Sequence, residues 1–180
     1  MKELSLNVLD IAKNSVKAGA NEIKITITET NDSLKMEIAD NGCGMKADFL
    51  KNVTDPWGTT RTTRKVGMGI PFLKLAAEQT GGSFDISSKH ESEYEDHGTV
   101  TTAIFNKDSI DFTPLGDIIS SVVTLIQGSP DIRWIFVHIQ PDKTVALDTD
   151  ELKAVLGDVP LDNIEVLMWI KGYLEEGYAG

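Results

Sequence analysis

An aspartate followed by two closely spaced glycines is the first group of residues in this sequence that could do chemistry. The segment Asp40-Asn41-Gly42-Cys43-Gly44 follows an alternating run that predicts a strand. A carboxylate held at the end of a strand can accept a hydrogen bond from an exocyclic amine, and glycines allow the backbone to approach a ligand closely. Asp-Asn-Gly is also a common hairpin turn, but a short helical stretch follows this segment instead of a second strand.

A second pair of glycines ends a polar loop and opens a helix. Gly67 and Gly69 precede a run with helical spacing, and the loop before them contains Arg61, Arg64 and Lys65. Free N–H groups at a helix N-terminus, together with the positive end of the helix dipole, favour phosphate. The alternative interpretation of this segment is a solvated surface loop.

Three polar residues share one face of the predicted N-terminal helix. Asp10, Asn14 and Lys17 follow one another at spacings of four and three, away from much of the apolar stripe of that helix. An acid, an amide and an amine in a row could orient water, ligate magnesium through the amide oxygen and contact phosphate. A plain solvated helix face is the alternative.

Hydrophobic periodicity predicts the elements that must position these residues. Helical spacing covers residues 4–18, 48–52 and a run from residue 70 to Gly81-Gly82, and alternating runs predict strands at 23–28, 34–38, 84–87 and 98–105. Four half-buried strands and two main helices predict an α/β fold. We expect a two-layer α/β sandwich with the helices on one face of a mixed, mostly antiparallel sheet.

The last part of the chain predicts a small α+β extension. We expect a Thr113-capped helix near 115–126, strands at 133–139 and near Val145, and helices near 151–156 and 163–176, with Asp148 at the start of a capping box. Residues 107–180 carry 5 basic and 13 acidic side chains, whereas residues 1–106 carry 12 and 15. We therefore predict a domain over 1–106 and an acidic extension over 107–180, which could pack on that domain or form a dimer or partner surface.

The overall composition excludes several classes of protein. With 180 residues, a net charge of −11 and 41% hydrophobic residues, the chain is in the ordinary globular range. Net negative charge repels phosphate backbones, so we expect no nucleic-acid partner. The chain has one cysteine, no apolar leader segment, and no run near the roughly 18 apolar residues of a membrane span. We expect a cytoplasmic protein with no membrane partner.

The order of these motifs resembles the GHKL superfamily of ATP-binding domains. That superfamily includes the catalytic domains of sensor histidine kinases, the MutL mismatch-repair proteins and the anti-sigma-factor serine kinases. The resemblance covers about residues 4–106: a polar helix face, a strand ending in D-x-G-x-G, a loop, G-x-G opening a helix, and Gly98-Thr99 entering a strand. It implies a Bergerat-type ATP-binding fold, with ATP and Mg²⁺ as ligands.

The resemblance implies a role for each residue at the adenine end of the nucleotide. Asp40 matches the aspartate that accepts the adenine amine, and Gly42 and Gly44 leave room for the base. Thr99 matches a threonine that supports this aspartate. These four residues are the adenine site that the resemblance predicts.

The resemblance implies that the polar face of the N-terminal helix and the second pair of glycines lie near the phosphates of the nucleotide. Asn14 matches the asparagine that holds the Mg²⁺ bridging the phosphates, and Lys17 matches a basic residue aimed at them. Gly67 and Gly69 match the glycines where a lid, over roughly residues 52–66, turns into its helix. The basic residues of that lid supply local positive charge for a polyanion.

Asp10 decides which chemistry the resemblance implies. Hydrolytic members of the superfamily have a water-activating glutamate at this position, and the histidine kinases usually have asparagine. ATP binding is therefore better supported than hydrolysis, and ATPase and protein kinase both stay open. We expect an ATP-binding protein that regulates or modifies a protein partner through its nucleotide state. The alternatives are a serine/threonine kinase resembling the anti-sigma-factor kinases and a non-enzymatic nucleotide-dependent adaptor.

Overall fold

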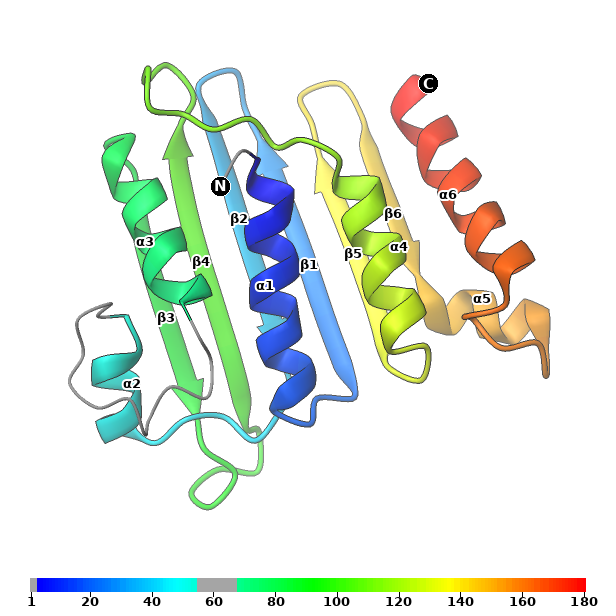
Figure 1. Cartoon of the computed structure of the whole chain (residues 1–180), viewed down its shortest axis with the longest axis horizontal. Helices are drawn as coiled ribbons and strands as arrows, with labels where there is room; N and C mark the ends of the chain where they lie inside the picture. Colours follow the sequence, from blue (N-terminus) through cyan, green and yellow to red (C-terminus); the bar gives the residue numbers. More distant parts are fainter. Residues whose placement is uncertain (1–2, 55–67) are drawn as a thin grey trace.

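The computed structural model describes residues 3–54 and 68–180 and arranges them as a single sheet covered by helices (Figure 1). The strands are β1 (Glu22–Glu29), β2 (Ser33–Asp40), β3 (Ser83–Lys89), β4 (Gly98–Asn106), β5 (Arg133–Ile139) and β6 (Thr144–Asp148). The helices are α1 (Leu4–Lys17), α2 (Ala47–Val53), α3 (Gly69–Gln79), α4 (Ile118–Gly128), α5 (Thr149–Leu156) and α6 (Ile164–Ala179). Among these described helices, none combines the length and the apolar character needed to cross a bilayer.

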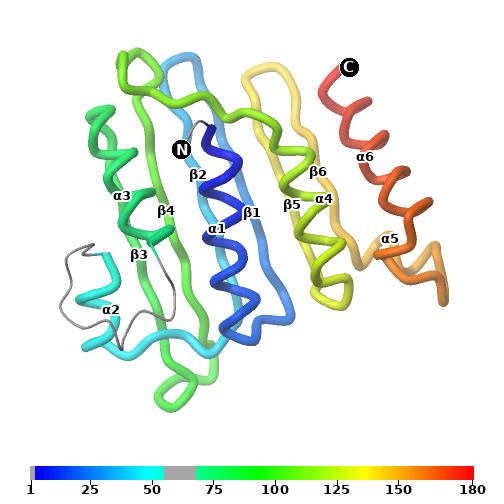
Figure 2. The backbone as a smooth tube through the Cα atoms, viewed as in Figure 1, coloured from blue at the N-terminus to red at the C-terminus, as the bar shows by residue number. Residues whose placement is uncertain are grey.

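The sheet is mixed and mostly antiparallel. Its strand order is β3-β4-β2-β1-β5-β6; β1 and β5 are parallel, and the other neighbouring pairs are antiparallel. Figure 2 shows the chain returning after β4 to place β5 beside β1. The predicted α/β sandwich with a mixed, mostly antiparallel sheet is confirmed.

The core lies between the sheet and the helices. Alternate residues of β1 and β2 point to the helices and are almost completely buried: Ile23, Ile25, Ile27, Leu34, Met36 and Ile38. Burying each such side chain contributes about 1.5–3 kcal/mol. Figure 1 shows α1 between α3 and α4 across one face of the sheet, and α6 lies against α4 and β6. The period-two pattern therefore sets the face that the helices cover.

The N-terminal caps of α4 and α5 can be compared with the predicted cap residues. Helix α4 begins at Ile118, and its N-cap is Asp117, whose carboxylate accepts the N–H of Ser120 at 3.0 Å. The predicted cap at Thr113 is therefore wrong, because residues 112–117 have no regular secondary structure and Gly116 adopts a positive φ of +76°. Asp148 caps α5 as predicted and accepts the N–H of Asp150 at 3.0 Å.

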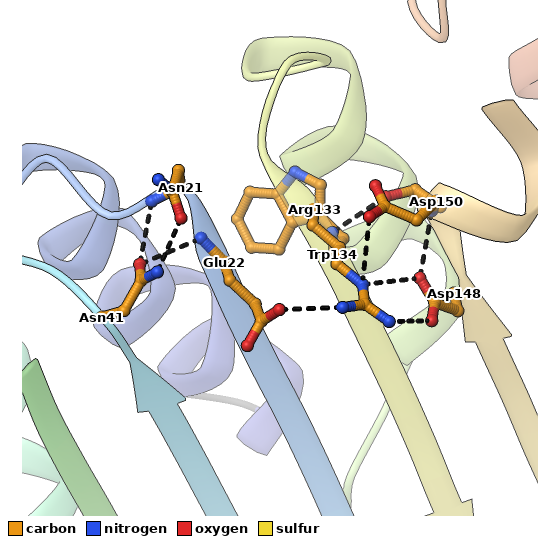
Figure 3. Close-up of polar contacts among 8 residues, drawn as sticks. Asn21, Glu22, Asn41, Arg133, Trp134, Asp148 and Asp150 are labelled. Atoms are coloured by element: carbon orange, nitrogen blue, oxygen red, sulfur yellow. Dashed lines mark hydrogen bonds and ion pairs between the residues drawn. The ribbon is translucent and has the colours of Figure 1, made fainter. Parts of the chain in front are cut away.

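Residues after Asn106 continue the same sheet. Arg133, at the start of β5, lies between the neighbouring strands: its Nη1 is 3.0 Å from Glu22 Oε1, and its Nη2 is 2.7 Å from Asp148 Oδ2 (Figure 3). The hydrogen bond from Arg133 holds the pKa of Asp148 below its usual value. The sheet is thus continuous across the boundary expected near Asn106, and the division of the chain into two domains stays a prediction.

Candidate functional site

The predicted motif residues meet at one end of the sheet. The C-terminal ends of α1 and β2 point to the lower side of the view in Figure 1, where α2 lies, and α3 starts from its own lower end. Two neighbouring cavities, of about 50 and 330 Å³, lie there. Both are lined by Asn14, Ala18, Gly44 and Met45. Motifs that are far apart in the sequence therefore line one recess.

Asp40 is oriented by three hydrogen-bond donors. Its Oδ1 accepts the N–H groups of Gly42 at 2.9 Å and Thr99 at 3.3 Å, and its Oδ2 accepts the hydroxyl of Ser15 at 2.5 Å. An ionised carboxylate offers about four acceptor positions, so Oδ2 keeps one for a further donor. Asp40 lines the smaller cavity, and this geometry suits recognition of an N–H group there.

The two glycines after Asp40 are required by close packing. A side-chain carbon on Gly42 would lie 2.7 Å from the Cβ of Ala18, and one on Gly44 would collide with the backbone oxygen of Lys89. Gly44 also has a φ of +73°, a conformation that other residues rarely adopt. The loop is therefore pressed between the end of α1 and the end of β3, where only hydrogen leaves enough room.

Backbone contacts hold this loop on both sides. The N–H of Cys43 donates to the carbonyl of Ala18 at 2.8 Å, and the N–H of Glu91 donates to the carbonyl of Cys43 at 2.8 Å. His97 Nδ1 lies 2.5 Å from the carbonyl oxygen of Gly42. The loop therefore joins the helical layer to the β3–β4 connection and is held in one conformation.

Asn41 ties the same loop to the first strand. Its Oδ1 accepts the N–H groups of Asn21 at 2.9 Å and Glu22 at 3.0 Å, and its Nδ2 donates to Asn21 Oδ1 at 2.6 Å (Figure 3). The side chain between Asp40 and Gly42 thus points away from the cavities. The Asn41 side chain satisfies the backbone N–H groups at the start of β1, so its function is structural.

Thr99 reaches the site together with a serine that sequence reasoning missed. The Ser88 and Thr99 hydroxyls lie 2.7 Å apart, and Ser88 Oγ also accepts the N–H of Met45 at 2.7 Å. Ser88 and Thr99 are directly paired in the β3–β4 register. Ser15 was missed as well, although it directly follows Asn14. Only the fold reveals either serine, because neither has a motif of its own.

Asn14 and Lys17 line the larger cavity. The Nδ2 of Asn14 is buried, and among the described residues it has no hydrogen-bond partner. Lys17 and Lys46 line the same cavity, as does His90. Two lysines around one cavity give it local positive charge in an acidic protein, which favours an anionic ligand.

Asp10 and Gly69 are neighbours across the interface between α1 and α3. A side-chain carbon on Gly69 would lie 3.2 Å from the Cβ of Asp10, so the carboxylate lies beside the N-terminal end of α3. The next residue on each helix, Ile11 and Ile70, lines the smaller cavity. The structure thus brings the predicted acid close to the cavity, at the helix end where free N–H groups favour anions.

Four predicted residues lie outside the described part of the chain. They are Arg61, Arg64, Lys65 and Gly67. Their assignment to a basic lid and to the first glycine of G-x-G stays a prediction.

An ion pair braces the connection beside the cavities. Lys89 Nζ lies 2.7 Å from Asp96 Oδ2. The hydrogen bond from Asp96 raises the pKa of Lys89, and the same bond lowers the pKa of Asp96. The pair spans the turn that carries His90 and precedes His97, so it helps to hold the outer wall of the site.

The fold and the site together define a Bergerat-type α/β domain of the GHKL class. The model of the family described as "Histidine kinase-, DNA gyrase B-, and HSP90-like ATPase" matches residues 2–109. The chain belongs to this family.

Known relatives and structures agree with this assignment. The chain is 31% identical over 94 residues to the sensor protein SrrB of Staphylococcus aureus (strain NCTC 8325 / PS 47), a match that spans 49% of this chain and 16% of that protein. Its fold is similar to the N-terminal domain of a DNA repair protein, with a TM-score of 0.58, 16% identity, and coverage of 88% of this chain and 58% of that one. It is also similar to the ADP-bound MutL ATPase domain of Aquifex aeolicus, with a TM-score of 0.54, 11% identity and coverage of 87% and 69%.

Proposed function

We propose that this chain binds MgATP, with the adenine at Asp40 and the phosphates toward Asn14 and the start of α3. The orientation of Asp40 is the observation that carries this proposal. Three donors fix its carboxylate, and one acceptor position on Oδ2 is left for the adenine amine. The family to which the chain belongs, named for ATPases, supports the same ligand.

The residues that line the larger cavity fit a magnesium-bound triphosphate. Magnesium prefers oxygen ligands and is usually held by one or two protein groups together with phosphates and water. The amide of Asn14 can supply one such oxygen, and its buried Nδ2 is otherwise unpartnered among the described residues. Lys17 and Lys46 would contact the phosphates electrostatically, since both line the larger cavity.

We further propose that the nucleotide state regulates or modifies a protein partner. The similarity to part of a sensor protein supports signalling as the context. Asp10 is our proposed general base for water or a hydroxyl group, and its position beside the start of α3 supports this role. Hydrolysis, transfer to a serine or threonine of a partner, and nucleotide-dependent binding without chemistry are the three ways in which such a site could work.

Calorimetric titration with MgATP tests the binding proposal. Asp40→Asn keeps the size of the side chain but removes its charge and half of its acceptor capacity, so we expect at least about a hundredfold loss of affinity. Asp85→Asn, an exposed acid on β3, is the matched control and should bind like the wild type. Absence of binding to the wild type at millimolar nucleotide, or equal binding by Asp40→Asn, would exclude this function.

Asp10→Asn separates binding from chemistry. If Asp10 acts as a base, the variant should bind MgATP with wild-type affinity and lose most of its turnover. Labelled γ-phosphate then distinguishes the reactions, because an ATPase releases free phosphate and a kinase labels a protein in the lysate. Full cellular function of Asp10→Asn, with loss of function in Asp40→Asn, would indicate the adaptor instead.

A further inference from the structure

A third cavity, of about 410 Å³, lies between β5, β6, α5 and α6. Figure 1 shows these elements at the opposite edge of the sheet from β3. Strands β5 and β6 form one wall, and helices α5 and α6 form the others. From the strands, half-buried Ile135 and Val137 and exposed Ala146 face this groove. These three residues alternate with the buried positions of the same strands, so they lie on the sheet face opposite the core.

The helix walls of the groove expose large apolar side chains. Trp169 and Tyr173 on α6 are 54% and 44% exposed, and their rings are stacked with centroids 5.3 Å apart. The Tyr173 hydroxyl donates to the carbonyl of Ala146 at 3.2 Å, which fixes the pair against the outer edge of β6. Val155 on α5, also lining the groove, is 85% exposed. Stacked, preoriented aromatic rings in a hollow are typical of the residues that dominate protein interfaces.

Further apolar residues are exposed on another side of α6. Ile164 and Met168 are strongly exposed and lie one helical turn apart, and Met168 directly precedes Trp169. Large apolar side chains that gather in an exposed hollow mark sites of interaction. The groove, with its exposed Val155, Trp169 and Tyr173, has this character.

The charge around the groove selects the kind of molecule. Glu151 lines the groove, and residues 149–165 carry five acidic side chains and one lysine. Arg133, at the start of β5, is already paired with Glu22, Asp148 and Asp150, so that cluster is also net negative. The groove is thus lined mainly by apolar side chains, together with the acids Asp148 and Glu151.

We propose that this groove docks a segment of a partner protein that has apolar side chains at its centre and lysine or arginine at its flanks. Opposite charge around the groove speeds encounter and excludes acidic competitors. A second copy of this chain would bring the same acidic extension, and an anionic lipid surface would be repelled. The proposal goes beyond nucleotide binding and names the chemistry of the partner.

Selection of random peptides displayed on phage against the 180-residue chain tests this proposal. We expect the enriched peptides to combine aromatic or aliphatic residues with flanking lysine or arginine. A labelled synthetic copy is then titrated by fluorescence anisotropy at low and high salt, without nucleotide. Enrichment of acidic peptides, no enrichment, or affinity that is unchanged by salt would overturn the proposal.

Substitutions in the groove locate the binding site. Val155→Arg places a cation in the groove and should weaken peptide binding at least tenfold, while Ile110→Arg, at a residue 96% exposed elsewhere, should not. Trp169→Ala and Glu151→Lys should each weaken binding several-fold. Peptide binding by Val155→Arg that equals that of the wild type would overturn the proposal. Two further results would also overturn it: a wild-type dimer in sedimentation that Val155→Arg dissociates, and binding of the wild type to anionic vesicles. Asp40→Asn should keep wild-type peptide affinity, so failure here is distinct from failure of nucleotide binding.

Discussion

The hydroxyl of Ser15 donates a 2.5 Å hydrogen bond to Oδ2 of Asp40. Ser15 is a buried residue of α1 and Asp40 is the last residue of β2, so this bond joins the helical layer to the sheet at the smaller cavity. It also determines which lone pair of the carboxylate stays available to a ligand. The orientation of the predicted adenine-binding acid therefore depends on a helix residue outside the recognised motifs.

Ser15→Ala should weaken MgATP binding at least about tenfold, because a hydrogen bond to a charged group is worth about 1.5–3 kcal/mol. The variant keeps Asp40 but removes the donor that orients Oδ2. Ser87→Ala, at an exposed position of β3, is the control. Calorimetry on both variants provides the measurement, and an affinity equal to that of the wild type for Ser15→Ala would show that the helix does not orient the acid.

Asn14→Ala should separate function from stability. The buried Nδ2 has no partner among the described residues, and alanine is the better helix former, so we expect a gain of about 0.5–1 kcal/mol in unfolding free energy. Affinity for MgATP should fall at least about tenfold, because the amide is the proposed metal ligand. Urea unfolding and calorimetry measure the two effects. Parallel loss of stability and binding would mean that Asn14 is a structural residue.

Gly44→Ala should destabilise the protein by more than about 2 kcal/mol, because the new side chain meets the Lys89 backbone and the φ of this residue is positive. Gly172→Ala is the matched control. It lies inside α6, where the added carbon meets no atom within 4 Å from the described residues outside the neighbouring helix backbone, and should raise stability by about 0.5–1 kcal/mol. Thermal unfolding of both variants tests the contrast, and similar melting temperatures would contradict the packing described for the loop.

His138 should make stability depend on pH. It is 1% exposed, with Nδ1 2.7 Å from the Tyr178 hydroxyl and Nε2 2.7 Å from Glu29 Oε1. Burial lowers the pKa of His138 in the folded state. Below its ordinary value of about 6.5, the unfolded chain therefore takes up a proton that the folded chain does not, and stability falls with falling pH by at most about 1.4 kcal/mol per pH unit.

The same cluster contains a second titrating group with a lower pH window. Burial by itself would raise the pKa of Glu29, but hydrogen bonds from Lys107 and His138 outweigh it and hold the pKa below its ordinary value of 4.5. The stability that Glu29 contributes to the folded state is lost only as pH falls from 4.5 through the lower folded-state pKa of Glu29. Urea unfolding from neutral pH to about pH 5 therefore reports His138, and His138→Gln should flatten that part of the profile. An unchanged slope in His138→Gln would refute this assignment.

The local elements could be predicted from sequence because each depends on near neighbours. The alternation in β1 and β2 and the helical spacing in α1 and α3 record which face is buried, and the structure places these elements within a residue or two of the predicted ends. The start of α4 was predicted wrongly. Thr113 and Asp117 are both acceptable caps by residue type. The carbonyls of Pro114 and Leu115 accept the N–H groups of Leu4 and Ser5 instead of starting a helix, so α4 begins only after Asp117.

The amino-acid sequence by itself determined the order of the elements, the α/β class and the motifs that assign the chain to its family, because periodicity and glycine spacing are local properties. The tertiary structure alone decided that Ser15 and Ser88 converge on the Asp40 site, and that β5 joins the sheet beside β1. It also decided that Trp169 faces outward from α6. These features depend on strand register and on packing between distant segments, and residue types within one segment do not encode either.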